Sequence, residues 1–110
     1  MFFKRKPAEI NNDEVMAIFM DALVALASSV VVDQDTDTML ATLELDPELR
    51  VNRISNFTLN DQPQSPDANV IESINQILSP LTQLPESARP ATLKMTFSEG
   101  GGDVVPTYND

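Results

Sequence analysis

The feature that most constrains this chain is a change of hydrophobic period along its 110 residues. Between residues 10 and 29, apolar side chains recur every three or four positions, which predicts a helix with one buried face. From Met39 to Leu45, apolar residues instead occupy every second position, which is the period of a half-buried strand. A chain this short has to bury the helix against the sheet, so we expect one α+β domain.

The middle of the chain continues this pattern with a second strand and a second helix. Residues 49–59 form a strand, with a bulge expected near residues 52–55, and residues 60–65 form a loop. The segment Ser65-Pro66-Asp67 combines an N-cap residue with a proline in the first turn, so it predicts a helix start. That helix ends near Leu78, because a proline follows two residues later.

Two more alternating segments lie toward the C-terminal end. Residues 93–97 and 104–108 form the third and fourth strands, and Pro106 confines the last strand to a sheet edge. We therefore expect the order helix, hairpin, helix, hairpin, with a four-stranded antiparallel sheet and two helices on one face. Residues 1–9 form a flexible basic tail, and residues 10–110 form a single α+β domain.

Composition excludes several kinds of chemistry. The chain has no cysteine and no histidine, which removes disulfides, thiol nucleophiles, imidazole bases and the usual zinc ligands. Its three glycines are consecutive, so no phosphate-binding loop of known spacing is present. The carboxylates are spread over turns and exposed faces and form no acid–base pair. We expect a protein that is not an enzyme and has no catalytic residues, cofactor or metal site.

Charge narrows the choice of partner. Seventeen acids and seven bases give a net charge of −10, and the first six residues contain three of those bases. This balance argues against nucleic acid as a ligand, because phosphate binding requires a basic surface. Asp13 precedes the first apolar stretch and Asp21 interrupts it, which argues against a membrane segment. We expect a cytoplasmic protein that interacts with neither nucleic acid nor membrane.

The acids at residues 33–46 form the sharpest local pattern. Asp33, Asp35, Asp37 and Glu44 match the acidic positions of a calcium-binding loop, but Thr38 stands where that loop requires glycine. A calcium-binding module built on the Asp33–Glu44 loop is therefore an alternative. The main prediction is a protein-binding surface at the sheet end that the first hairpin reaches. Its candidate contact residues are Asp33, Asp35, Asp37, Glu44 and Asp46.

A compact acidic domain attracts basic proteins, which indicates an inhibitor that covers the basic active site of a toxin. The C-terminal segment contains Leu93-Lys94-Met95-Thr96-Phe97, Ser98-Glu99-Gly100, Val104-Val105 and Tyr108-Asn109-Asp110. It resembles the final hairpin of the YezG-like family of bacterial immunity proteins. It differs from that family in having no tryptophan. The resemblance implies a cytoplasmic antitoxin that binds and neutralises a cognate bacterial toxin.

Two competing hypotheses also involve protein surfaces. The first hypothesis is a phage or bacterial assembly or adaptor protein that self-associates through the apolar first helix. The polar face of that helix is narrow, so an apolar strip is left for a second copy to cover. A DNA mimic would instead present its carboxylates at phosphate-like spacing to a DNA-binding enzyme. The immunity protein would be a monomer or homodimer with a basic partner, whereas the assembly protein would be an oligomer.

Overall fold

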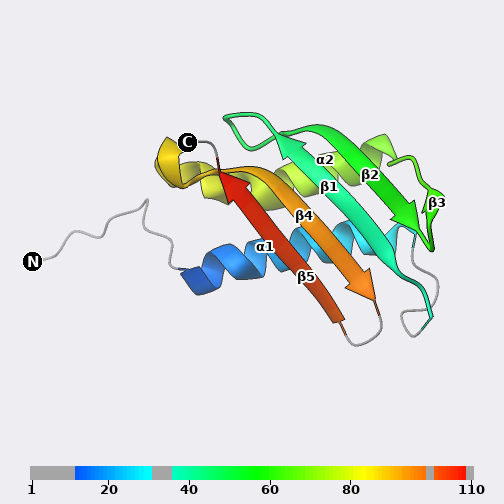
Figure 1. The fold of residues 1–110 in the computed structure, drawn as a ribbon. Helices are drawn as coiled ribbons and strands as arrows, with labels where there is room; N and C mark the ends of the chain where they lie inside the picture. The colour runs from blue at the N-terminus through cyan, green and yellow to red at the C-terminus, as the bar shows by residue number, and fades with distance from the viewer. Residues whose placement is uncertain (1–11, 31–35, 99–100, 109–110) are drawn as a thin grey trace, which may run out of the picture.

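The chain forms an antiparallel sheet of five strands with two α-helices packed on one side of it (Figure 1). The computed structural model describes residues 12–30, 36–98 and 101–108. The strand order across the sheet is β3-β2-β1-β4-β5, so the central strand β1 pairs with β4 from the other half of the chain. The elements are α1 (Asn12–Ser28), β1 (Met39–Leu45), β2 (Val51–Leu59), β3 (Gln62–Pro63), α2 (Ala68–Leu78), the 3-10 helices η1 (Ser79–Gln83) and η2 (Glu86–Ala88), β4 (Pro90–Ser98) and β5 (Gly101–Tyr108).

The α+β class is confirmed, but the predicted four-stranded sheet is wrong, because the expected loop at 60–65 contains β3. Asn60 and Asp61 adopt φ angles of 53° and 68°, which suit a tight hairpin turn, and Gln62 and Pro63 then pair with the end of β2. The simple order helix, hairpin, helix, hairpin is wrong for the same reason. Two 3-10 helices also separate α2 from β4. The predicted tail at residues 1–9 lies outside the described residues.

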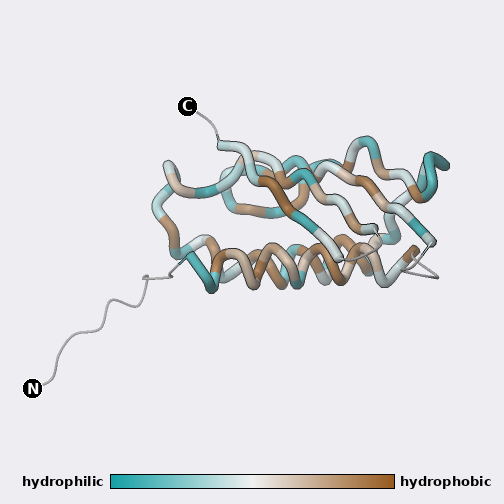
Figure 2. Tube along the Cα trace, turned by 60° about the horizontal axis from the view of Figure 1, so that its bottom comes forward, coloured by the Kyte–Doolittle hydropathy of each residue, from teal (hydrophilic) through white to brown (hydrophobic). Residues whose placement is uncertain are grey.

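The hydrophobic core lies between the sheet and the two helices, and Figure 2 shows these two layers edge-on. Alternation along β1 directs Met39, Ala41 and Leu43 toward the helices, as the period of two requires. The helices contribute their own apolar stripes to the same layer. The largest fully buried side chains are Phe19, Leu23, Leu26, Met39, Leu43, Leu49, Ile74, Leu78, Leu81, Leu93 and Met95.

Strand β2 contains two irregularities where it pairs with β1. Arg53 pairs with Glu44 while Val51 pairs with Leu45, so Asn52 is an extra residue, within the region where we predicted a bulge. A second irregularity follows at Asn56, whose φ of 52° lies in the left-handed region that asparagine tolerates. These irregularities change which face of the sheet the β2 side chains occupy.

Helix α2 begins two residues later than its sequence suggests. Its N-cap is Asp67, whose carboxylate accepts a hydrogen bond from the Asn69 N–H at 3.0 Å, and not Ser65. The helix ends at Leu78, as predicted. Near its middle the buried Asn75 side chain accepts a hydrogen bond from the Val51 N–H at 2.7 Å, which fixes α2 against the first residue of β2.

Both edges of the sheet carry a proline. Pro106 lies in β5 at one edge, as predicted, and Pro63 lies in the two-residue strand β3 at the other. Proline has no N–H to donate, so it interrupts the row of backbone groups that an incoming strand would need. Strand β3 covers only the end of β2, at Thr58 and Leu59, and Pro106 is a single position within β5.

Candidate functional site

The three predicted contact residues that the structure describes, Asp37, Glu44 and Asp46, lie at opposite ends of β1. Asp37 precedes the strand and accepts a hydrogen bond from the Asn60 side-chain amide at 2.9 Å. The Asn60 side-chain oxygen in turn accepts from the Thr38 N–H at 2.8 Å, so Asp37 belongs to the end of the sheet where β2 turns into β3. Asp33 and Asp35 lie outside the described residues.

Glu44 and Asp46 lie at the other end of β1, beside the turn into β2. Ser55 donates its hydroxyl proton to Glu44 Oε2 at 3.1 Å. Asp46 Oδ1 accepts hydrogen bonds from the backbone N–H groups of Glu48 at 2.9 Å and Arg50 at 3.0 Å. The Asp46 carboxylate therefore holds its own turn together, which is a common structural role for aspartate.

The expected clustering of Asp37 with Glu44 and Asp46 at one sheet end is wrong, because strand β1 separates Asp37 from the other two. From Met39 to Glu44 the strand alone spans about 17 Å, at about 3.4 Å per residue. Ligands of one calcium ion lie within about 2.6 Å of it, so Asp37 and Glu44 cannot bind the same ion. No group of three or more potential metal ligands occurs among residues 12–30, 36–98 and 101–108.

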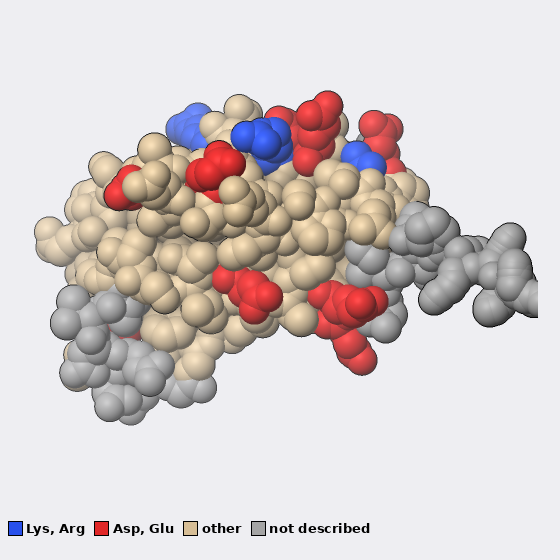
Figure 3. All heavy atoms as spheres, turned by 180° about the vertical axis from the view of Figure 1, so that it is seen from behind, with Lys and Arg blue, Asp and Glu red and all other residues tan. Residues whose placement is uncertain are grey.

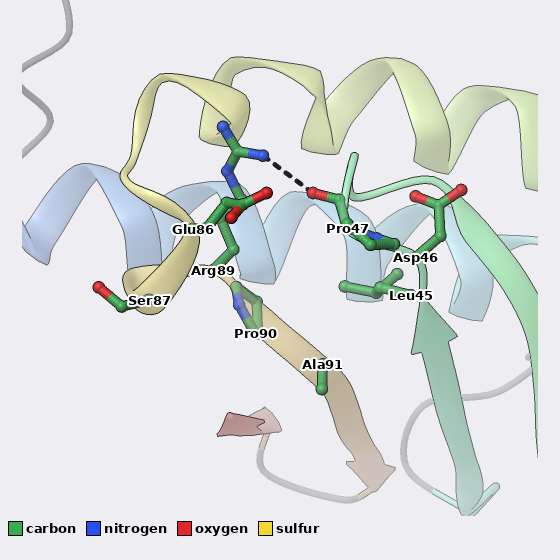
Figure 4. Close-up of a pocket in the computed structure, with 8 residues that line it drawn as sticks. All are labelled: Leu45, Asp46, Pro47, Glu86, Ser87, Arg89, Pro90 and Ala91. Atoms are coloured by element: carbon green, nitrogen blue, oxygen red, sulfur yellow. Dashed lines mark hydrogen bonds between the residues drawn. The ribbon is translucent and has the colours of Figure 1, made fainter. Parts of the chain in front are cut away.

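A shallow hollow of about 440 Å³ lies where the β1–β2 turn meets η2 (Figure 4). The Arg89 side chain crosses this region and donates to three backbone carbonyls, those of Leu84 at 2.9 Å, Pro47 at 2.9 Å and Thr82 at 2.5 Å. Its guanidinium is therefore engaged in holding the connector after α2 to the β1–β2 turn. The hollow adds the acids Asp46 and Glu86 and the hydroxyl of Ser87, a set without a nucleophile–base pair.

The outer face of the sheet, on the side away from the helices, is rich in hydroxyl groups. Its apolar side chains are few, with Leu40 41% and Val105 49% exposed. Its charges nearly balance, because Glu44 pairs across the strands with Arg53, and β4 and β5 add one base and one acid. This face therefore has no strong preference for a basic partner. Its charged and hydroxyl residues are Thr42, Glu44, Arg53, Ser55, Thr58, Thr92, Lys94, Thr96, Asp103 and Thr107.

Helix α1 presents a different surface, which we call the α1 outer face and define as Met16, Ala17, Met20, Asp21 and Val24. Met16 is 43% exposed and Val24 is 53% exposed, although both are apolar. Met16, Met20 and Val24 recur every four residues, so they follow one side of the helix. The buried side of α1, which includes Phe19 and Leu23, faces the core instead.

The helix layer is acidic throughout. Residues 12–28 and 67–78 include five acids and no lysine or arginine. The described basic side chains instead lie on β2, β4 and the connectors; they are Arg50, Arg53, Arg89 and Lys94. Figure 3 shows the molecule from behind. On this face the basic side chains lie only along the upper margin, whereas acidic side chains also lie lower down, among uncharged residues. The acids of the helix layer are Asp13, Glu14, Asp21, Asp67 and Glu72.

The sequence contained a signal for the α1 outer face. The narrow polar face of the first helix predicted either burial on all sides or an exposed apolar strip. The structure shows the second arrangement, because α2 and the sheet leave Met16 and Val24 in solvent. The candidate contact residues chosen from the sequence include none of the residues on this face.

No helix in the described part of the chain has both the length and the apolar character needed to cross a membrane. Comparisons of this chain with protein-family models, curated proteins and solved structures found no match.

Proposed function

We propose that this chain is a non-enzymatic immunity protein that neutralises a cognate bacterial toxin in the cytoplasm by binding to a basic surface of that toxin. The observation that carries the proposal is the separation of charge within the fold. The helix layer holds five acids and no base, whereas the outer face of the sheet is nearly balanced. One side of the molecule is thus suited to a basic protein.

The physical basis is electrostatic steering followed by apolar anchoring. A net charge of −10 on a small body attracts a basic partner over a distance of about one Debye length, roughly 8 Å at physiological salt. Such steering raises the association rate, whereas a few well-packed apolar anchors determine how long the complex lasts. A molecule that acts in this way needs no catalytic residue.

The cytoplasmic location is part of the proposal. The chain has no cysteine, so its stability owes nothing to an oxidising compartment. An immunity protein has to meet its toxin inside the cell that it protects.

Co-expression with the protein encoded next to this chain tests the proposal. We expect that neighbour to stop growth when expressed alone, and growth to recover when this chain is present. The two purified proteins should form a complex on size-exclusion chromatography. A neighbour that is harmless, or one whose toxicity persists although this chain is expressed and folded, would contradict the proposal.

The acids first chosen from the sequence remain candidates for contact and can be tested in that complex. Reversal of Asp33, Asp35 and Asp37 to lysine should lower the association rate at low salt by about tenfold. A matched control reverses Glu48, Glu86 and Asp103, three exposed acids outside the helix layer, and so changes the net charge equally. Equal effects in the two triple variants would remove the first group from the contact surface.

A second candidate function is that of an assembly or adaptor protein that self-associates through α1. The exposure of Met16 and Val24 favours it, because apolar side chains on a helix surface often mark an interface. Sedimentation equilibrium of the purified chain separates the two functions. A concentration-dependent oligomer that Val24→Asp disperses would support assembly, and a monomer up to high concentration would support the immunity protein.

A further inference from the structure

The α1 outer face has the dimensions of a helix-binding surface. Met16, Met20 and Val24 lie one turn apart and together span about 12 Å, at about 1.5 Å per residue. A partner helix presents anchors at the same repeat, typically residues i, i+3 or i+4, and i+7. Met16 and Val24 are exposed and Met20 between them is half-buried, so the stripe matches two turns of an amphipathic helix.

The charges beside this stripe restrict the chemistry of the occupant. Asp13 and Asp21 are both exposed on α1, and the helix contains no lysine or arginine. A helix that pairs its apolar side with Met16, Met20 and Val24 would bring its flanking residues near these carboxylates. Lysine or arginine at the flanks would be attracted, whereas glutamate or aspartate would be repelled.

A second copy of α1 fits this surface less well. It would supply the same apolar stripe, but it would also bring Asp21 of one copy close to Asp21 of the other, because Asp21 lies next to Met20 at the middle of that stripe. Like charges at an interface cost free energy, and two chains of net charge −10 repel each other before contact.

We infer that the α1 outer face binds a basic amphipathic helix of a partner protein, with Met16, Met20 and Val24 as apolar anchors and Asp13 and Asp21 as charge partners. This inference rests on the proposed function and identifies the surface of this chain and the kind of partner segment involved. It adds a contact on the helix layer to the candidate acids at residues 33–46.

A model peptide provides the probe. It contains only leucine and lysine, is about four helical turns long, and has its leucines at spacings of three and four. We expect isothermal titration calorimetry to detect binding to the full chain at low salt. A peptide of the same composition with alternating leucines should bind at least about tenfold more weakly, because it cannot form an amphipathic helix.

Exposed residues on the two faces of the protein provide matched variants. Val24→Asp and Asp21→Lys should each weaken peptide binding by about tenfold or more. Val105→Asp and Asp103→Lys on β5 make the same changes on the outer face of the sheet, where Val105 is 49% exposed, and should alter binding less than about twofold. All four residues are exposed, and thermal unfolding checks that each variant remains folded.

Three results would overturn the inference. The first is equal loss of binding in the α1 and β5 variants. The second is a homodimer that Val24→Asp dissociates, which would make a second copy the occupant. The third is peptide binding that becomes about tenfold tighter when Lys4, Arg5 and Lys6 are changed to serine, which would mean that the basic segment of this chain already covers the face.

The growth assay separates failure of this inference from failure of the proposed function. If Val24→Asp still protects cells from the toxin as well as the native chain does, the inference is wrong and the immunity function stands. If the peptide binds to α1 as expected but no neighbouring toxin is neutralised, the surface assignment stands and the immunity function is wrong.

Discussion

Gly102 in β5 allows α1 to approach the sheet closely, and adding a single methyl group there tests the packing of the core. A Cβ atom at this position would lie 2.4 Å from Leu23 Cδ2, 3.3 Å from Phe97 Cδ1 and 3.4 Å from the Thr96 carbonyl oxygen. Carbon atoms in contact ordinarily lie about 3.5–4.0 Å apart, so the Leu23 methyl group would have to move by roughly 1 Å. Leu23 is fully buried at 0% exposure, so its side chain cannot move out into solvent without leaving the core.

We expect Gly102→Ala to lower the free energy of unfolding by about 1–3 kcal/mol, the usual cost of overpacking a core. The double variant with Leu23→Ala removes the clashing methyl group, so the two changes should couple favourably by about 1 kcal/mol or more. Urea unfolding followed by circular dichroism measures all four chains of this cycle. Asp103→Ala, which lies next to Gly102 but is exposed, should change stability by less than about 0.5 kcal/mol.

Two results would refute this reasoning about Gly102. One is a Gly102→Ala chain as stable as the native protein. The other is strict additivity with Leu23→Ala, since it would mean that the methyl group and the Leu23 side chain do not compete for one space. Either result would place α1 farther from β5 than the structure does.

Substitutions at three further positions, Arg89, Asn75 and Leu49, test how the turns and connectors are held to the rest of the fold. Arg89→Ala should lower the free energy of unfolding by about 2 kcal/mol in a urea titration, and Arg89→Lys should restore little, because an ammonium group cannot reach three carbonyls in a planar fork. Asn75→Leu leaves the Val51 N–H without its acceptor and should lower the free energy of unfolding by about 1–3 kcal/mol. Hydrogen exchange at the Val51 amide should become faster, and native-like exchange would contradict this expectation. Leu49 is buried and has a φ of 65°, a backbone conformation in which glycine is about 1 kcal/mol less strained than alanine. Thermal unfolding should therefore show Leu49→Gly to be no less stable than Leu49→Ala.

Hydrophobic period and the positions of proline were enough to predict most of the longer helices and strands. Strand β1 occupies Met39–Leu45 as its alternation indicated, and α2 ends at Leu78, before Pro80. Strand β3 could not be predicted in this way, because two residues that include a proline have no period. The feature that creates it is the left-handed backbone of Asn60 and Asp61, which many loops share.

The candidate site was harder to predict, because it depends on which side of each element stays in solvent. Asp37 and Glu44 are seven positions apart in the sequence, and only the extended conformation of β1 separates them in space. Met16 and Val24 are apolar and were available as a signal. Whether α2 or solvent lies beside them is a matter of tertiary packing, which a local pattern does not contain.

The most direct test of binding to a basic partner is an association rate. Stopped flow measures how fast this chain associates with the protein encoded beside it over a range of salt concentrations. Binding steered by the acidic helix layer predicts that the association rate falls by about tenfold between about 50 and 300 mM salt, and that Asp21→Lys reduces this dependence while Asp103→Lys does not. An association rate that does not change with salt, or the absence of any complex between the two folded proteins, would contradict this mode of action.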